Sequence, residues 1–270
     1  MSSKRHAGRT ALTVVGAATL LVACAGEPAT GPVSRAETSR EPTTLASACA
    51  AGESPSCRLE AAATGLDAWW AERAPDYTTP RVIVLDGPTD SACGALDREN
   101  LAVYCGADRS IYLSVQDLDA ITGGGRAAIF VLAHEWAHHA QHLAGLDEEQ
   151  YAASESVPEL APALSVAYEL MADCLAGAWL TSADERATSG PTDADDYLDV
   201  MLLVGALADE GELPDDITLV PETFTHGSAE QRQAWTSVGF GSTLLEMDPI
   251  GACDTFESLF AAVEERAGRG

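Results

Sequence analysis

Positive charge is scarce in this chain of 270 residues. Its 15 Lys and Arg face 42 Asp and Glu, which gives a formal net charge of −27, and Lys4 is the one lysine in the sequence. Because so acidic a surface repels a phosphate backbone, we exclude nucleic acid as a partner. The near absence of lysine points to no mechanism, since genome base composition explains it as well as selection does.

The N-terminal apolar run is too short for a stable membrane span. Basic residues at 4, 5 and 9 precede an apolar stretch from Thr10 to Ala23 with the length of a secretory signal. The stretch ends in Leu21-Val22-Ala23-Cys24, which resembles the lipobox of bacterial lipoproteins. The resemblance implies cleavage before Cys24, lipid on its sulfur, and a lipid-anchored protein on the extracytoplasmic side of the cell membrane. An ordinary signal peptide or an uncleaved anchor is the alternative.

Composition divides the chain into three expected parts. Residues 1–23 form the signal peptide, residues 24–52 form a disordered tether rich in Pro, Ser, Thr and Glu, and residues 53–270 form one domain with its own core. Loss of the signal would remove three basic and no acidic residues, so the net charge would change from −27 to −30.

The most informative pattern is His134-Glu135-Trp136-Ala137-His138 inside a long apolar run. No Pro or Gly occurs between residues 126 and 144, so the run is predicted to be a helix. Positions i and i+4 on a helix are about 40° apart, which places His134 and His138 on one face where both can bind one cation. Glu135 is placed to act on a metal-bound water.

A second helix is expected to supply a carboxylate ligand. Glu169 and Asp173 are four residues apart and share a helix face among apolar neighbours. Glu169 follows His138 by 31 residues, which allows a loop and a returning helix to bring it to the metal. Two His and one Glu leave a fourth position open, as in catalytic zinc sites. Asp173 is expected to accept the other N–H of a ligand imidazole.

Spacing excludes two other ligand sets. A metzincin needs Gly three residues and His six residues after the second histidine, where this chain has Gln141 and Ala144. Cys174 lies about 140° around the helix from Glu169 and is poorly placed as a thiolate ligand. We treat the remaining His139 and His142 as structural or as partners of the ligands.

The patterns outside the motif indicate an α+β, mostly helical fold. The strands at 101–104 and 110–114 are expected to pair as an antiparallel hairpin, and an acidic linker at 147–149 is expected between the two site helices. Expected helices lie at 58–73, 160–180, within 193–209 and at 255–266, and a further strand lies at 81–85.

Six cysteines remain once Cys24 is assigned to lipid, and an even number in an exported chain indicates disulfides. Cys93 and Cys105 flank one predicted hairpin arm and are expected to pair. Cys49–Cys57 would be a local clasp at the start of the domain, and Cys174–Cys253 would tie the C-terminal helix to the central helices. The alternative is that some of these cysteines stay reduced in the core.

Four blocks in order resemble the bacterial putative neutral zinc metallopeptidase family. They cover roughly residues 80–240 and are far more specific than HExxH alone. The resemblance implies a zincin-like domain that binds one Zn²⁺ per chain, with Glu169 as the third ligand. Trp136-Ala137 and Ser114 depart from the family pattern, which leaves substrate preference open. The blocks are Tyr104-Cys-x-x-Asp108…Ile111-Tyr-Leu113, His134-Glu-x-x-His-His-x-Gln141, Glu169-Leu-x-Ala-Asp-Cys-x-Ala-Gly-x-Trp179 and Thr225-His-Gly-Ser-x-Glu-Gln-Arg232.

Residue types then indicate a mechanism. Glu135 would be the general base toward a zinc-activated water, and His226 the candidate donor to the oxyanion. Ser228 caps the following helix, with Gln231 three residues on, which would hold His226 firmly. A purely local packing role for His226 is the alternative. Tyr168 is a second possible donor, disfavoured because it lies about 100° from Glu169.

The sequence therefore predicts a membrane-anchored zinc metallopeptidase that hydrolyses peptide or protein substrates in the cell envelope. The strand at 110–114 is expected to be the edge strand that aligns an extended substrate. The alternative is a non-catalytic zinc-binding or scaffold lipoprotein that keeps the same fold. The retained Glu135 favours catalysis, because a binding protein has no need of it.

Overall fold

The computed structural model describes residues 42–52, 54–74, 76–182, 185–186, 193–208 and 225–268, except for the side chains of residues 257 and 258. The expected signal peptide, Cys24 and the expected tether as far as residue 41 lie outside these residues.

The described part opens with a helix within the stretch expected to be a tether. Thr44 caps the start of helix α1 (Leu45–Ala50), because its hydroxyl accepts a hydrogen bond from the backbone N–H of Ser47. Leu45 and Ala48 are buried. The folded region therefore starts before residue 53, because these two apolar side chains pack into the domain. Helix α2 (Ser54–Ala71) follows and buries the adjacent Trp69 and Trp70.

A small mixed sheet follows α2. Strands β1 (Arg81–Val84), β4 (Ala102–Cys105) and β5 (Ser110–Leu113) lie in the order β1-β5-β4. The expected hairpin is present as the antiparallel pair β4 and β5, and β1 adds to β5 in parallel. Strands β2 (Thr89–Ser91) and β3 (Gly94–Leu96) form a separate antiparallel pair.

The expectation that residues 110–114 form an edge strand is wrong. Strand β5 is the central strand, and all four of its residues are buried. Ile111 and Leu113 pack into the main core and Tyr112 into a second buried cluster, so both faces of β5 are covered. Strand β4 is an edge strand of this sheet instead.

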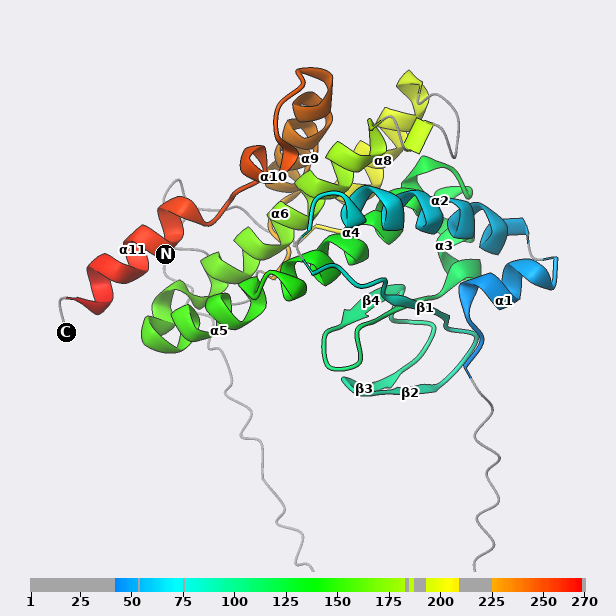
Figure 1. Cartoon of the computed structure of the whole chain (residues 1–270), viewed down its shortest axis with the longest axis horizontal. Helices are drawn as coiled ribbons and strands as arrows, with labels where there is room; N and C mark the ends of the chain where they lie inside the picture. Colours follow the sequence, from blue (N-terminus) through cyan, green and yellow to red (C-terminus); the bar gives the residue numbers. More distant parts are fainter. Residues whose placement is uncertain are drawn as a thin grey trace, which may run out of the picture. The chain divides into compact units, whose positions relative to one another are not determined.

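The motif helix is buried on nearly every side. Helix α3 (Val115–Thr122) ends at Gly123, which has a left-handed φ of 68°, and the glycine loop leads into α4 (Arg126–Leu143). Helix α4 packs against α2, α3, α5, α6, α8 and the sheet. Figure 1 shows α4 between the sheet and the helices α6, α8 and α9.

The chain returns past α4 through two more helices. Residues 147–149, expected as a linker, lie in the first turn of α5 (Leu146–Ser156), where three carboxylates favour the positive end of the helix dipole. A 3₁₀ turn (Pro158–Leu160) leads into α6 (Ala161–Leu180). Residues Pro158–Leu180 are long and apolar enough to cross a membrane, but 83% of that apolar window is buried inside the domain. This is the pattern of a core helix.

The C-terminal helices close the domain around α6. Helix α8 (Ala194–Ala206) contacts α4, and α9 (Ala229–Leu244) packs along α6. The approach of α6 and α9 is so close that a Cβ on Gly239 would overlap the carbonyl oxygen of Cys174. Helices α10 (Pro249–Ala252) and α11 (Glu257–Ala267) complete the chain.

Three disulfides join the six remaining cysteines in the pairs that the sequence predicts. The pair Cys49–Cys57 links α1 to α2, and Cys93–Cys105 links the β2–β3 turn to the end of β4. The pair Cys174–Cys253 spans 79 residues and holds the segment after α10 against α6.

Candidate metal centre and active-site cleft

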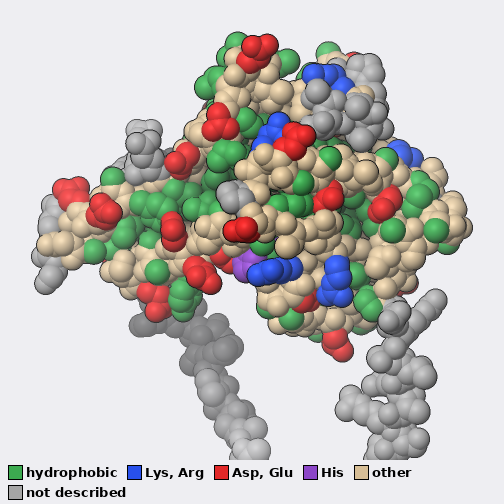
Figure 2. Space-filling view, viewed as in Figure 1, with side chains coloured by type: hydrophobic (Ala, Val, Ile, Leu, Met, Phe, Trp, Pro, Cys, Tyr) green, Lys and Arg blue, Asp and Glu red, His purple; other side chains and the backbone are tan. Residues whose placement is uncertain are grey.

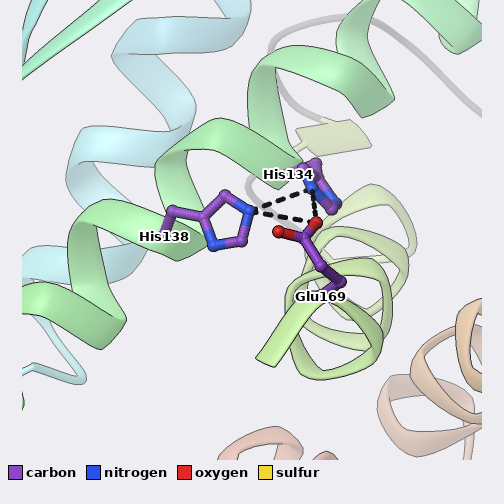
Figure 3. A group of neighbouring side chains, drawn as sticks. All are labelled: His134, His138 and Glu169. Carbon is purple, nitrogen blue, oxygen red and sulfur yellow. Dashed lines mark hydrogen bonds and ion pairs between the residues drawn. The ribbon is translucent and has the colours of Figure 1, made fainter. Parts of the chain in front are cut away.

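Three ligand atoms from two helices converge on one point. Helix α4 contributes Nε2 of His134 and of His138, and α6 contributes Oε2 of Glu169 (Figure 3). The two imidazole nitrogens are 3.1 Å apart, and Glu169 Oε2 lies 3.1 Å from His134 and 3.4 Å from His138. The helical spacing of the two histidines and the return of α6 along α4 produce this convergence.

These separations fit a tetrahedral metal ion. Ligand bonds of roughly 2.0–2.1 Å in tetrahedral geometry place neighbouring donor atoms about 3.3 Å apart. His134 and His138 are buried and Glu169 is half-buried, so the cluster is held in place yet keeps one open side. Two imidazoles and one carboxylate with an open position form the donor set of a catalytic zinc site.

A chain of hydrogen bonds fixes the His134 ring. Its Nδ1 donates to Asp173 Oδ1 over 2.9 Å, which turns Nε2 toward Glu169. Asp173 is fully buried and accepts from Nε and Nη2 of Arg232, over 2.7 and 2.8 Å. Arg232 reaches it from α9. Asp173 therefore lies where the predicted acceptor of the His134 N–H should be. Arg232 extends this series of hydrogen bonds to a third helix, α9.

A second chain orients His138. Its Nδ1 lies 2.8 Å from the side-chain oxygen of Gln141, and the amide nitrogen of Gln141 donates to the carbonyl oxygen of Tyr168 over 2.9 Å. The Tyr168 ring stacks on the His138 ring at 5.1 Å between centroids, with 10° between the planes. Tyr168 thus borders the metal site even though it lies a third of a helical turn from Glu169.

The same contacts determine the charges of the cluster. Burial lowers the pKa of His134, but its hydrogen bonds to Asp173 and Glu169 outweigh burial and raise it to about 10. Burial likewise raises the pKa of Glu169, but the two adjoining imidazoles outweigh it and hold the pKa well below its ordinary value.

The cluster borders an open cavity of about 370 Å³. Glu135 lines it next to the ligands, and His226 lines it from the start of α9. The Ser228 hydroxyl and the Gln231 side chain form the predicted capping box at that helix start. His226 is exposed, and its Nδ1 lies 2.8 Å from the hydroxyl of Thr225. Figure 2 shows a histidine side chain at the surface of this face of the molecule, with acidic and basic side chains beside it.

The edge strand β4 forms one wall of this cleft. Residues Ala102, Val103 and Tyr104 line the cavity opposite the metal ligands. Strand β4 is therefore the edge strand beside the cleft, in place of residues 110–114. Its outer backbone groups have no neighbouring strand in the described sheet, so they can pair with an extended chain in the cleft.

The other two histidines of α4 face the protein rather than the metal. His139 is fully buried between the Tyr104 hydroxyl, at 3.0 Å, and the carbonyl oxygen of Thr78, at 2.6 Å. His142 Nδ1 pairs with Asp147 over 2.6 Å.

Sequence reasoning missed Gln141 and Arg232 as partners of the ligands. The position of Gln141 three residues after His138 was a usable signal, because i and i+3 side chains meet on a helix. No local spacing connects Arg232 to Asp173, which lies 59 residues earlier.

Helix α4 carries the histidine pair of HExxH, and α6 carries a glutamate as the third ligand. With an edge strand beside them, these two helices define a zincin-like metal centre. A family model described as putative neutral zinc metallopeptidase matches residues 14–256, so the chain belongs to this family. The domain thus has a metallopeptidase-like site.

Curated relatives share this similarity over most of the chain. An uncharacterized protein of Mycobacterium tuberculosis is 31% identical over 217 residues, which cover 75% of this chain and 71% of the relative. The uncharacterized protein YpfJ of Escherichia coli K12 is 30% identical over 203 residues, which cover 72% of this chain and 68% of the relative. No solved structure matches the chain significantly.

Proposed function

We propose that this protein is a membrane-anchored zinc endopeptidase of the cell envelope. The observation that carries the proposal is the convergence of His134, His138 and Glu169 beside Glu135, in a cleft that an edge strand borders. A ligand set alone would fit a metal-binding protein. The adjoining carboxylate and the open strand edge are what a peptide hydrolase needs in addition.

His134, His138 and Glu169 would hold the zinc ion. When bound there, zinc supplies Lewis-acid chemistry, which acidifies water and polarises the scissile carbonyl. Glu135 takes a proton from the attacking water and passes it to the amine nitrogen as the C–N bond breaks. Water thereby contributes a hydroxyl to the new carboxyl group and a proton to the new amine.

Two side chains on the cleft can donate to the developing oxyanion. His226 and Tyr168 both line the cavity that contains Glu135. Burial raises the pKa of the Tyr168 hydroxyl, so it keeps its proton at neutral pH and can donate. His226 is the stronger candidate because it lies just before the capped start of α9, whereas the Tyr168 ring is engaged with His138.

We infer the location of the enzyme from its N-terminal sequence. Lipidated Cys24 would anchor the chain outside the cytoplasmic membrane, and the segment after it would act as a tether for the domain. An acidic domain at that position acts on peptides and proteins rather than on nucleic acids.

A Glu135→Gln variant tests catalysis separately from metal binding. We expect zinc content near one per chain in both proteins, and hydrolysis of an unfolded protein substrate reduced at least about 100-fold in the variant, because general-base catalysis contributes roughly that much. Zinc content is measured by elemental analysis and cleavage by gel and mass spectrometry.

Two results would count against the proposal. Equal cleavage by wild type and variant would mean that a contaminating protease is responsible. A wild-type protein that binds zinc but cleaves nothing would support the non-catalytic zinc-binding alternative.

A further inference from the structure

A second, mainly apolar cavity of about 230 Å³ opens beside the catalytic glutamate. We call it the α8 cavity, because α8 and the turn after it supply much of its wall. Its apolar lining consists of Leu101, Ala102, Phe130, Val131, Leu203, Val204 and Leu207. It is smaller than pockets that enclose drug-sized ligands, which start at about 300 Å³, and has the scale of a single side chain.

The α8 cavity adjoins the metal-site cavity at one point. Ala102, His134, Glu135 and His226 line both. From this junction the α8 cavity extends toward the N-terminal ends of β4 and α4, at Leu101 and residues 130–131. The metal-site cavity extends the opposite way, toward the C-terminal ends of the same two elements.

The two ends differ in polarity. The metal-site cavity is lined on its far side by Tyr104, Tyr168 and the carboxylate of Asp147. The α8 cavity contains one charged wall residue other than those at the junction, Arg232. The guanidinium donates twice to Asp173 and once to the carbonyl oxygen of Leu207, so its charge is already balanced.

The direction of strand pairing orients a substrate across the junction, and the position of Glu135 is compatible with that direction. A chain that pairs antiparallel with β4, the more stable arrangement, runs with its C-terminal part toward Leu101 and therefore toward the α8 cavity. Glu135 must also return its proton to the leaving amine, which is on the C-terminal side of the broken bond. Glu135 lines both cavities, so it can reach an amine that lies on the side of the α8 cavity.

We propose that the α8 cavity binds the side chain of the substrate residue immediately after the scissile bond and selects a large apolar side chain there. The inference rests on the proposed function and gives it a substrate class: unfolded or extended chains cut before residues of the size of leucine or phenylalanine. The energy comes from removing that side chain from water into an apolar wall.

Substitution of Leu207 tests the cavity without disturbing the core. Leu207 lines the cavity, yet 40% of its surface is exposed, so a Leu207→Trp variant can fold while its ring narrows the cavity. Leu202→Trp is the matched control, because Leu202 lies on α8 just before Leu207, is 61% exposed and is outside the cavity.

Cleavage sites in a peptide library are mapped by mass spectrometry for the three zinc-loaded proteins. Wild type and Leu202→Trp should cut mostly before Leu, Phe, Ile or Met. In Leu207→Trp, kcat/KM for a leucine peptide should fall about 10- to 100-fold while the matched alanine peptide is nearly unaffected. An apolar preference before the scissile bond, or identical profiles for all three proteins, would overturn the proposal.

A binding experiment distinguishes failure of the cavity from failure of the proposed function. Zinc-loaded Glu135→Gln is titrated with a peptide hydroxamate that has an isobutyl group after its zinc-binding end, and with the same compound lacking that group. Tighter binding of the isobutyl compound, lost in Glu135→Gln/Leu207→Trp and kept in Glu135→Gln/Leu202→Trp, supports the cavity even if no peptide is cleaved. Equal binding of the two compounds refutes it, whatever the hydrolytic activity.

Discussion

At the scale of single residues, the site depends on buried charges that are fully paired. Asp173 and Arg232 are both buried, and each satisfies the other while Asp173 also orients His134. Removal of one partner from such a pair leaves an uncompensated charge in the interior, which costs more than the pair itself contributes. Helix α6 therefore contributes two carboxylates one turn apart. Glu169 is a candidate metal ligand, and Asp173 orients the His134 ring.

We expect Asp173→Asn to weaken both the fold and the metal site. The loss of charge leaves Arg232 unbalanced, so the free energy of unfolding should fall by about 3–5 kcal/mol. The affinity for zinc should fall about 10- to 100-fold, because His134 loses its orienting acceptor. Urea unfolding of the metal-free protein and competition with a chelator measure the two effects separately.

Asp199→Asn provides the control, since Asp199 is exposed on α8. This variant should change neither the free energy of unfolding nor the free energy of zinc binding by more than about 0.5 kcal/mol. Unchanged zinc affinity in Asp173→Asn would contradict the assigned role of the carboxylate.

At the scale of elements, the edge strand beside the site is anchored by the turn that follows it. Asp108 Oδ2 accepts from the Tyr112 hydroxyl over 2.7 Å and from the backbone N–H of Ala92 over 3.2 Å, and so ties the β4–β5 turn to the β2–β3 pair. Partial burial raises the pKa of Asp108, but these hydrogen bonds outweigh it and the pKa is lowered.

This lowered pKa predicts a contribution to stability that depends on pH. A carboxylate whose pKa is lowered in the folded state stabilises the fold fully at pH values above its pKa in the unfolded chain, which is about 4. This stabilisation is lost as the pH falls through the lowered pKa of the folded state. Asp108→Asn should therefore flatten the fall in stability below about pH 4, whereas Asp90→Asn, at an exposed position on β2, should leave it unchanged. Thermal melts between pH 2 and 7 compare the variants; parallel curves for wild type and Asp108→Asn would exclude the effect.

The contact between α6 and α9 makes a different prediction. A side chain on Gly239 would collide with the backbone of α6, so Gly239→Ala should destabilise the domain by about 1–3 kcal/mol. A Cβ on Gly241, in the same helix, would meet nothing within 4 Å. Gly241→Ala should therefore stabilise the domain by up to about 1 kcal/mol, since glycine is unfavourable in helices. Urea unfolding measures the change in the free energy of unfolding for each variant. Changes of the same sign in Gly239→Ala and Gly241→Ala would refute the close packing of α6 and α9.

At the scale of the whole molecule, the proposed anchor and the acidic domain would act together. We expect the full chain, expressed in a bacterial host, to fractionate with membranes and to incorporate labelled fatty acid. Cys24→Ala should lose the label, because the acylated sulfur would be absent. Cys49→Ala, which removes a disulfide cysteine instead, should keep it. Label that persists in Cys24→Ala would exclude lipidation at this residue.

Much of the site could be predicted because its ligands have local signals. The four-residue spacing of His134 and His138, and of Glu169 and Asp173, determines a shared helix face wherever the helices lie. The cysteine pairs could be inferred from their places beside expected elements. Helix boundaries also followed from apolar periodicity and from turn residues, although α5 was missed because its acidic first turn resembles a linker.

The order of the strands and the long-range partners were decided only by the tertiary structure. Nothing in residues 110–113 indicates that β1 pairs with them in parallel, so the edge beside the site is β4 instead. The sequence by itself predicted two ligands, a base and a third ligand one helix away. The tertiary structure determined that Arg232 completes the buried charges and that an apolar cavity adjoins Glu135. The reason is physical: spacing fixes directions within one helix, whereas contacts between distant elements depend on how all of them pack.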